Sequence, residues 1–213
     1  DIVEKYGADT FRMYEMFLGP IEQSKPWNTN GITGVFNFLR KFWRLWFREG
    51  VLSVTDEAPT ETELRVLHKT IRKIGDDIEK FSFNTSVSSF MICVNELTDA
   101  DCRKRAILEP LCILISPFAP HIAEELWHLM GNTSSVMNAA FPEFREEYLT
   151  ENEFEYPVSI NGKTRFKIRL ALSLTSEQVQ ERVLGADEID KYLNGTKPKK
   201  IIVVPGRIVN VVV

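Results

Sequence analysis

The sequence of 213 residues predicts an α+β fold, in which a mainly α-helical bundle precedes a small α+β module of two β-hairpins and two short helices. In roughly the first 130 positions, apolar residues recur at steps of three and four, as along one face of a helix. Near the end of the chain the period becomes two, which is typical of strands. We therefore expect a helical domain over residues 1–151, with a trailing linker from about 132, and a second domain over 152–213.

The first elements are predicted to be helical. Residues 2–18 predict a helix that Gly7 divides and that Gly19-Pro20 ends. After the irregular loop 21–30, a second helix is expected from about Gly31 to Arg48. Its apolar stripe consists of Ile32, Val35, Phe36, Leu39, Phe42, Trp43, Trp46 and Phe47.

The other side of that second helix carries four cations, namely Arg40, Lys41, Arg44 and Arg48. The simpler interpretation is a solvated cationic surface on a core helix. The alternative is contact with RNA phosphates, favoured by the lack of a carboxylate in this stretch before Glu49.

The rest of the bundle is expected to consist of antiparallel helices with short connections. A capping box at Thr60–Glu63 opens the next helix, Asn84 can cap the one after it, and Asp101 is expected to begin the fourth. The stretch Ile113–Trp127 then breaks at two prolines and restarts as the helix that Gly131 ends. His121 has no nucleophile nearby in sequence and is interpreted as structural. His68 has no second metal ligand within reach in sequence and is expected at the surface or at its boundary.

The module begins with a hairpin whose turn is Asn161-Gly162, a pair that favours positive φ angles. In its second strand four cations alternate with other residues, so they are expected on one face: Lys163, Arg165, Lys167 and Arg169. Like charges two apart repel, which favours an anionic partner over a solvated face. Two short helices are expected next, a first that a Thr175–Gln178 capping box opens and that reaches Leu184, and a second over 186–193. The closing hairpin adds cations that could share the surface: Lys197, Lys199, Lys200 and Arg207.

Composition limits the function classes. Residues 1–151 carry 16 Lys and Arg against 23 Asp and Glu, a net charge of −7, whereas residues 152–213 carry 10 against 7, a net charge of +3. A basic end on an acidic body indicates a polyanion partner there. The three cysteines show no metal spacing and their odd number fits a reducing compartment. No signal peptide or long apolar run occurs, so we expect a cytoplasmic protein without a membrane partner.

Three strings of residues resemble a known family. SPFAPHIAEELW, at residues 116–127, resembles the helix corner in the tRNA-binding domain of class I aminoacyl-tRNA synthetases for leucine, isoleucine, valine and methionine. Residues 1–27 are similar to the segment directly after the KMSKS-type loop of leucyl-tRNA synthetases. PVSINGKTRFKI, DKYLNG and KKIIVVPGRIVNVVV resemble the C-terminal domain of the bacterial-type leucine enzymes.

The resemblance implies the C-terminal part of an ATP-dependent leucine–tRNA ligase of protein biosynthesis, with an anticodon-binding-type helical domain. Its implied partners are tRNA(Leu) and the missing catalytic domain of the same chain, and not DNA. ATP with Mg²⁺ would serve the full-length parent, while this part needs no cofactor, has no catalytic residues or metal site, and should be inactive alone. Two alternatives stay open: the equivalent part of a valyl- or isoleucyl-tRNA synthetase, and a helical protein-interaction scaffold without an RNA role.

Overall fold

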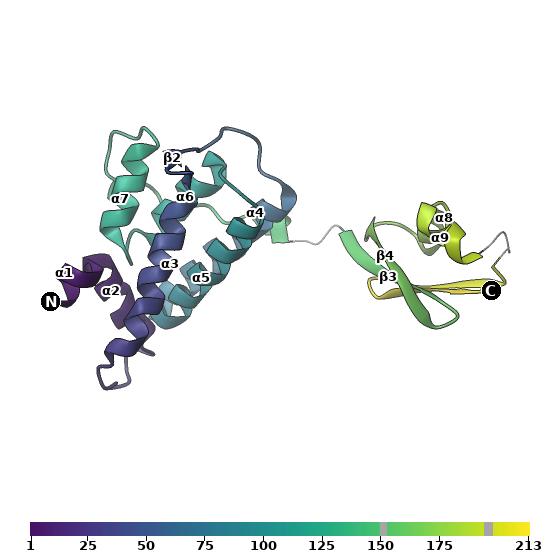
Figure 1. The fold of residues 1–213 in the computed structure, drawn as a ribbon, viewed down its shortest axis with the longest axis horizontal. Coiled ribbons are helices and arrows are strands. Elements are labelled where there is room, and N and C mark those ends of the chain that lie inside the picture. Colours follow the sequence, from purple (N-terminus) through teal and green to yellow (C-terminus); the bar gives the residue numbers. More distant parts are fainter. Residues whose placement is uncertain (150–152, 194–197) are drawn as a thin grey trace. The chain divides into compact units, whose positions relative to one another are not determined.

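The computed structural model describes residues 1–149, 153–193 and 198–213. The chain divides into two compact units, Asp1–Leu149 and Thr150–Val213, each with its own apolar core (Figure 1). The boundary expected between 151 and 152 lies outside the described residues. The predicted fold class, mainly α-helical with a smaller α+β part, is confirmed.

The first unit is a helical bundle (Figure 1). Its helices are α1 (Ile2–Tyr6), α2 (Ala8–Phe17), α3 (Ile32–Arg44), α4 (Glu61–Glu79), α5 (Phe83–Asp99), α6 (Arg105–Ile115) and α7 (Pro120–Leu129). Single 3-10 turns lie at η1 (Thr29–Gly31), η2 (Val136–Asn138) and η3 (Glu146–Leu149), and one small hairpin joins β1 (Phe47–Arg48) to β2 (Val51–Leu52). The predicted capping box opens α4, where Thr60 and Glu63 bond each other's backbone N–H groups.

The corner between α6 and α7 lies at the centre of this core. Phe118 is fully buried there, with its ring edge-on to those of Phe90 at 5.3 Å and Phe83 at 6.1 Å. Pro120 occupies the first turn of α7, where a missing N–H costs nothing. The exposed N–H groups of that turn are capped from α2, because the Asp9 carboxylate accepts from Ile122 N at 2.7 Å and His121 N at 3.3 Å.

The expectation that the second helix reaches Arg48 is wrong, because α3 ends at Arg44. Glu49 and Gly50 adopt positive φ angles of 51° and 81° and form the tight turn of the β1–β2 hairpin. Two consecutive positive φ angles are what a two-residue hairpin turn requires and what a continuing helix excludes. Arg48 therefore lies on a strand, paired with Val51.

Two helix starts also differ from expectation. Helix α5 begins at Phe83, just ahead of Asn84, because Phe81 takes the positive φ (54°) that ends α4. Asp101 does not begin α6: with φ 47° it ends α5, and α6 starts only at Arg105.

Residues 132–149 pack against the bundle. Val136 is buried, and the Glu124 carboxylate of α7 accepts from its N–H at 3.0 Å and from the Ser135 hydroxyl at 2.9 Å. Further along, the 3-10 turn η3 contacts α4. This segment therefore belongs to the first unit and supplies part of its core.

The second unit is a four-stranded sheet in the order β4-β3-β6-β5. Its elements are β3 (Glu153–Ile160), β4 (Lys163–Ala171), α8 (Ser176–Leu184), α9 (Asp187–Leu193), β5 (Lys200–Val204) and β6 (Ile208–Val212). Both hairpins are antiparallel, and they join through the parallel pair β3–β6. Asn161 and Gly162 have the positive φ angles (49° and 79°) that the first turn was predicted to need.

The two faces of this sheet differ. One face packs with α8 and α9 around Tyr156, Val158, Val209 and Val211. The other face carries the alternating residues of each strand and no described helix.

Candidate nucleic-acid interface

A β-bulge in β4 divides the cationic strand. The register runs from Val158 opposite Phe166 directly to Ser159 opposite Thr164, which leaves Arg165 as the extra residue. Residues that face each other across a ladder point to the same side of the sheet. The expectation that all four cations share one face is therefore wrong, since one inserted residue reverses the alternation.

Lys167 and Arg169 lie on the face opposite the helices. Each is paired with a residue next to core-facing Tyr156, Lys167 with Pro157 and Arg169 with Glu155. Both side chains are exposed. The Lys167 Nζ lies 2.8 Å from Glu155 Oε2, and this hydrogen bond lowers the pKa of the Glu155 carboxyl.

Lys163 and Arg165 lie on the side of the helices. Lys163 is opposite Ile160, a core residue, and the Arg165 guanidinium sits 5.4 Å from the centre of the Tyr192 ring on α9. Such cation–π contacts are worth about 0.5–1 kcal/mol at exposed sites. These two cations are thus separated from Lys167 and Arg169 by the thickness of the sheet.

The closing hairpin adds one cation to the open face. Lys200 is opposite Val212 and alternates with core-facing Ile201, so it shares the face of Lys167 at the other edge of the sheet. Lys199 is exposed just before β5, and Arg207 is exposed in the turn between β5 and β6. Lys197 lies outside the described residues.

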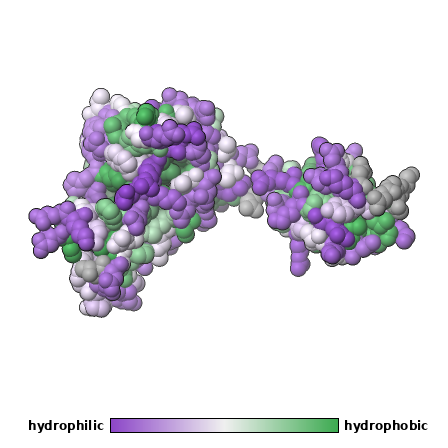
Figure 2. All heavy atoms as spheres, viewed as in Figure 1, coloured by the Kyte–Doolittle hydropathy of each residue, from purple (hydrophilic) through white to green (hydrophobic). Residues whose placement is uncertain are grey.

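The β5 edge of the open face is partly apolar. Ile202 and Val204 of β5 are 41% and 39% exposed, and hydrophobic residues reach the surface over the β5–β6 hairpin in Figure 2. The open face, as used below, consists of Lys167 and Arg169 on the edge strand β4 and of Lys200, Ile202 and Val204 on the opposite edge strand β5. It combines positive charge with a flat apolar area, which suits a nucleic acid backbone with exposed sugars or bases.

Three of the four cations predicted on the second helix line a groove of about 940 Å³ between α3, the β1–β2 hairpin and the end of α5. Arg40, Lys41 and Arg44 line it. Lys41 is already engaged, because its Nζ donates to Asn95 Oδ1 at 2.7 Å. Arg48 points its guanidinium to within 3.8 Å of Asp101. Because α3 ends at Arg44 and Arg48 lies on β1, the four cations do not share one helix face.

Arg103, just ahead of α6, organises the end of α3. Its Nη1 donates to the carbonyl oxygens of Arg44, Leu45 and Phe47 at 3.2, 3.2 and 2.8 Å. A cation at this position satisfies the unpaired carbonyls and the negative end of the helix dipole. Arg103 is far from α3 in sequence, so no local pattern could have indicated this role.

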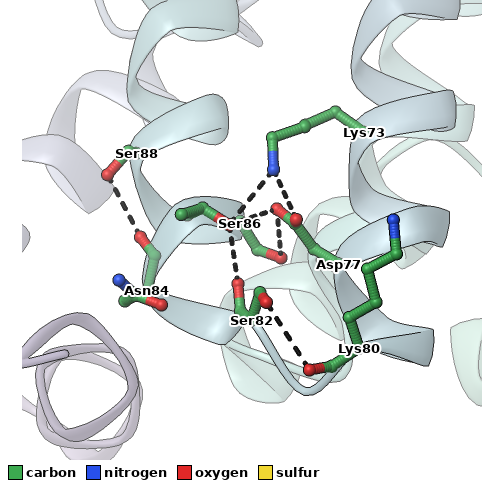
Figure 3. Close-up of polar contacts among 8 residues, drawn as sticks. Lys73, Asp77, Lys80, Ser82, Asn84, Ser86 and Ser88 are labelled. Atoms are coloured by element: carbon green, nitrogen blue, oxygen red, sulfur yellow. Dashed lines mark hydrogen bonds and ion pairs between the residues drawn. The ribbon is translucent and has the colours of Figure 1, made fainter. Parts of the chain in front are cut away.

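A buried polar cluster joins α4 to the start of α5 (Figure 3). The Asp77 carboxylate receives hydrogen bonds from Lys73 Nζ, from the Thr85 hydroxyl at 2.7 Å and from the Ser86 hydroxyl at 3.4 Å. A lysine beside a hydroxyl and a carboxylate resembles a catalytic group. Here every donor points at one buried carboxylate, so the cluster's role is to hold the α4–α5 corner.

We expect Asp77→Asn to lower the free energy of unfolding of the first unit by about 1–3 kcal/mol, since an amide cannot accept from all three donors. Chemical denaturation monitored by circular dichroism measures this. The matched control is Asp76→Asn, an exposed neighbour that should leave stability within about 0.5 kcal/mol of wild type. Equal effects of the two variants would contradict the assignment.

His68 attaches the segment that leads out of the first unit to α4. Its buried ring stacks on Tyr148 with centroids 4.5 Å apart, and its Nδ1 accepts from Arg145 N at 3.2 Å. That acceptor role requires a neutral ring. Burial, and then the charge of Arg145, lower the pKa of His68, while Glu147 and Glu143 oppose the shift.

The lowered pKa predicts a pH dependence. Between the folded pKa of His68 and its ordinary value near 6.5, the unfolded chain binds more protons than the folded chain does. The free energy of unfolding therefore rises with pH in this window. The contribution of His68 is complete above about pH 6.5 and is lost as pH falls through the folded pKa. We expect His68→Gln, whose carbonyl can accept but cannot titrate, to flatten stability against pH in this window.

Denaturation at several pH values checks that expectation. His68→Phe is the control, since it keeps the stacking but removes the acceptor. An unchanged slope in His68→Gln would contradict the role given to the neutral ring.

No metal site or reactive thiol emerges in the described part of the chain. Within residues 1–149, 153–193 and 198–213, no group of three or more His, Cys, Asp or Glu side chains could hold a metal ion. Burial raises the pKa of Cys93 to about 12 and that of Cys102 to about 11, and it also raises the pKa of Cys112. Among the described helices, none has the length and apolar character needed to cross a membrane.

A family model described as the anticodon-binding domain of tRNA ligase matches residues 62–181, more than half of the chain. The chain belongs to this family. Its sequence is 59% identical over all 213 residues to the leucine–tRNA ligase of Cytophaga hutchinsonii and 58% identical over 212 residues to that of Flavobacterium psychrophilum. It spans only 23% and 22% of the lengths of these two relatives, whose C-terminal region it matches.

A solved structure agrees with this family membership. The chain aligns with the ternary complex of Agrobacterium radiobacter K84 agnB2 LeuRS, tRNA and LeuAMS at a TM-score of 0.64 and 28% identity. The alignment covers 99% of this chain and 29% of that one. These relatives are leucine enzymes, which favours the leucine assignment over the valine and isoleucine alternatives.

Proposed function

We propose that the chain is the tRNA-binding C-terminal part of a leucine–tRNA ligase and holds tRNA(Leu) for attachment of leucine elsewhere in the enzyme. The observation that carries this proposal is the open face, where Lys167 and Arg169 lie on one edge strand and Lys200 lies on the other beside the exposed apolar residues Ile202 and Val204. Full-length relatives named leucine–tRNA ligase and a similar structure solved with tRNA support it.

The open face would bind phosphates and sugars more than it reads bases. Lysine and arginine on strands present charges at fixed spacing to a backbone, and such contacts carry little sequence information. The exposed Lys199 and Arg207 extend the positive surface near the same hairpin, and Lys197 remains a predicted contact. Lys163 and Arg165 form a second predicted set on the helix side of the sheet.

The cations around α3 are a further predicted RNA surface. Arg48 and Lys41 would have to release Asp101 and Asn95 to bind phosphate. Arg40 and Arg44 form no ion pair within the described part of the chain. The α3 surface is thus less prepared for RNA than the open face.

The division of labour within the parent enzyme is part of the proposal. Leucine activation with ATP and Mg²⁺ belongs to the catalytic domain outside these residues, and the ligase works in the cytoplasm. The chain itself contributes positioning and no bond-making step. It should therefore support no leucine-dependent exchange of pyrophosphate into ATP.

The test is a titration of the chain with a tRNA(Leu) transcript at two salt concentrations. We expect binding that weakens with salt, with log K falling by about 0.7–0.9 per unit of log salt for each phosphate contact. An isolated helical scaffold without an RNA role would show no saturable binding at either concentration. Leucine-dependent pyrophosphate exchange, measured on the same preparation, tests the proposal that the chain contributes no bond-making step.

A further inference from the structure

The central parallel pair of the second unit's sheet is extended by hydrogen bonds beyond both of its ends. Residues 158–160 of β3 pair with residues 209–211 of β6. At one end, three further bonds join the β3–β4 turn to β6: Asn161 N to Val211 O at 2.9 Å, Val213 N to Asn161 Oδ1 at 3.1 Å, and Gly162 N to Asn210 Oδ1 at 3.2 Å. At the other end, the described structure shows one bond between β3 and the β5–β6 turn, from Gly206 N to the Tyr156 hydroxyl at 2.9 Å. The position of that turn relative to β3 therefore depends on one side chain.

Tyr156 belongs to the apolar core, although its side chain ends in a polar group. It is 1% exposed, and its ring packs edge-on against Phe154 with centroids 5.0 Å apart. A phenylalanine ring would give the same packing, whereas a hydroxyl removed from water needs a hydrogen-bond partner. The partner here is the backbone of Gly206, an exposed residue. The hydroxyl thus connects the core to a turn at the surface.

The β5–β6 turn has a defined local shape. Arg207 N donates to Val204 O at 3.0 Å, and Pro205 and Gly206 lie between them. Gly206 adopts a φ of 64°, so the order Pro-Gly matches that of a type II turn. These residues determine the shape of the turn, but they do not determine its direction relative to β3. The bond to Tyr156 supplies that second constraint.

The Leu172 side chain also lies beside the turn. A Cβ atom added at Gly206 would sit 3.6 Å from its Cδ2. Leu172 is 39% exposed, and apolar contact is non-directional. Leu172 can therefore cover the turn, but it cannot orient the turn as a hydrogen bond does.

Arg207 is the charged residue that this turn presents to solvent. It is exposed, and it forms no ion pair with the residues that the structure describes. A planar guanidinium binds a phosphate through two parallel N–H groups, so the geometry of its contact matters more than for the point charge of a lysine. A change in the direction of the turn would therefore weaken a phosphate contact of Arg207 even though the charge is still present.

We propose that Tyr156 is a positioning residue for RNA binding, whose buried hydroxyl fixes the 205–207 turn so that the Arg207 guanidinium meets a phosphate in one orientation. The inference rests on the proposed function, because it takes Arg207 as an RNA contact. Tyr156 is buried and touches no RNA itself. The alternative is that the hydroxyl only stabilises the fold.

The two roles of the hydroxyl predict different salt dependences. A hydroxyl that only stabilises the fold changes the fraction of binding-competent protein. Its removal lowers the apparent affinity by the same factor at every salt concentration, so the slope of log K against log salt is unchanged. Loss of a phosphate contact instead flattens that slope by about 0.7–0.9.

A double-mutant cycle on the 213-residue chain measures the coupling between the two residues. A tRNA(Leu) transcript is titrated against ionic strength with wild type, Tyr156→Phe, Arg207→Gln and the double variant. We expect Arg207→Gln to weaken binding about tenfold and to flatten the slope by about 0.7–0.9. Tyr156→Phe should weaken binding by about threefold or more and flatten the slope in the same direction. In the Arg207→Gln background it should have no further effect.

Tyr14→Phe is the matched control. Tyr14 is a 3% exposed tyrosine of the first unit, whose hydroxyl donates to the Asn28 carbonyl oxygen. Its removal takes away a hydroxyl of similar burial without touching the β5–β6 turn. The tRNA affinity of the folded protein and its salt slope should stay at the wild-type values.

Amide hydrogen exchange, followed by NMR, reports on the turn without RNA. We expect the Gly206 amide to exchange about tenfold faster in Tyr156→Phe, since the exposed turn loses the bond that protects this amide. The amides of Val209 and Val211 should keep their wild-type rates, which also verifies that the unit stays folded.

Four results would overturn the positioning role: equal losses from Tyr156→Phe in both backgrounds, an unchanged salt slope, an unchanged Gly206 exchange rate, or wild-type binding by Arg207→Gln. Each of these leaves the proposed function standing, because the wild-type chain still binds tRNA. A wild-type chain that does not bind tRNA would defeat the proposed function, and the RNA role of Tyr156 with it.

Discussion

Phe118→Ala is expected to lower the free energy of unfolding of the first unit by about 3–5 kcal/mol, the usual cost of deleting a fully buried aromatic ring. Phe118 is 1% exposed and holds the α6–α7 corner against Phe90 and Phe83. The removed ring leaves a cavity between three helices that the proline-stiffened corner cannot collapse to fill. A unit of this size should then melt roughly 10 °C lower.

Thermal and chemical denaturation of the first unit measure this effect. Phe141→Ala is the matched control, since Phe141 is 51% exposed and the same truncation there should cost about 1 kcal/mol or less. If the two variants lose the same stability, the corner is not the centre of the core.

Reversing two charges, Lys167→Glu with Arg169→Glu, is expected to weaken tRNA binding at least tenfold. A hydrogen bond to a charged group contributes about 1.5–3 kcal/mol, and about 1.4 kcal/mol corresponds to tenfold in affinity. Loss of two phosphate contacts should also flatten the salt dependence by about 1.4–1.8 in log–log slope. Titration of the double variant against ionic strength, with circular dichroism to verify folding, measures both quantities.

A double variant with the same change in net charge, on the other side of the sheet, provides the control. Lys163→Glu with Arg165→Glu alters the charge equally but lies on the helix side of the strand. We expect a smaller loss of affinity there. Glu155→Gln should act in the opposite direction, because it frees Lys167 from its ion pair. Equal losses in the two double variants would show that overall charge, and not the open face, determines binding.

Local patterns predicted the local structure of this chain. The Thr60–Glu63 capping box, the proline corner around Phe118 and the Asn161-Gly162 turn each depend on residues within a few positions of one another, and the structure has all three. Their physical causes, namely an orphan N–H, a missing N–H and a positive φ, can be identified in the sequence itself.

The features that sequence reasoning missed are those set by distant contacts. The bulge at Arg165 depends on how β4 pairs with β3. The period-two spacing of the sequence cannot indicate that one residue of β4 has no partner on β3. The β1–β2 turn shortened α3 although its apolar period continues to Phe47. The sequence identifies Arg103 only as a basic residue. Its role depends on the carbonyl groups at the end of α3, which the fold places beside it. The candidate site was therefore predicted as a set of residues, but its division between two faces was not.

The parallel pairing of β3 with β6 has a consequence for how the second unit folds. Each hairpin closes between neighbours in the sequence, so both can form on the microsecond scale. The central pair joins Val158 to Val209, and everything between them must be ordered or looped out before that contact forms. Docking of the two hairpins is therefore the slow step. Because the hairpins form before they dock, substitutions in either turn and at the β3–β6 seam should slow refolding, whereas contacts that form only after docking should mainly change the unfolding rate.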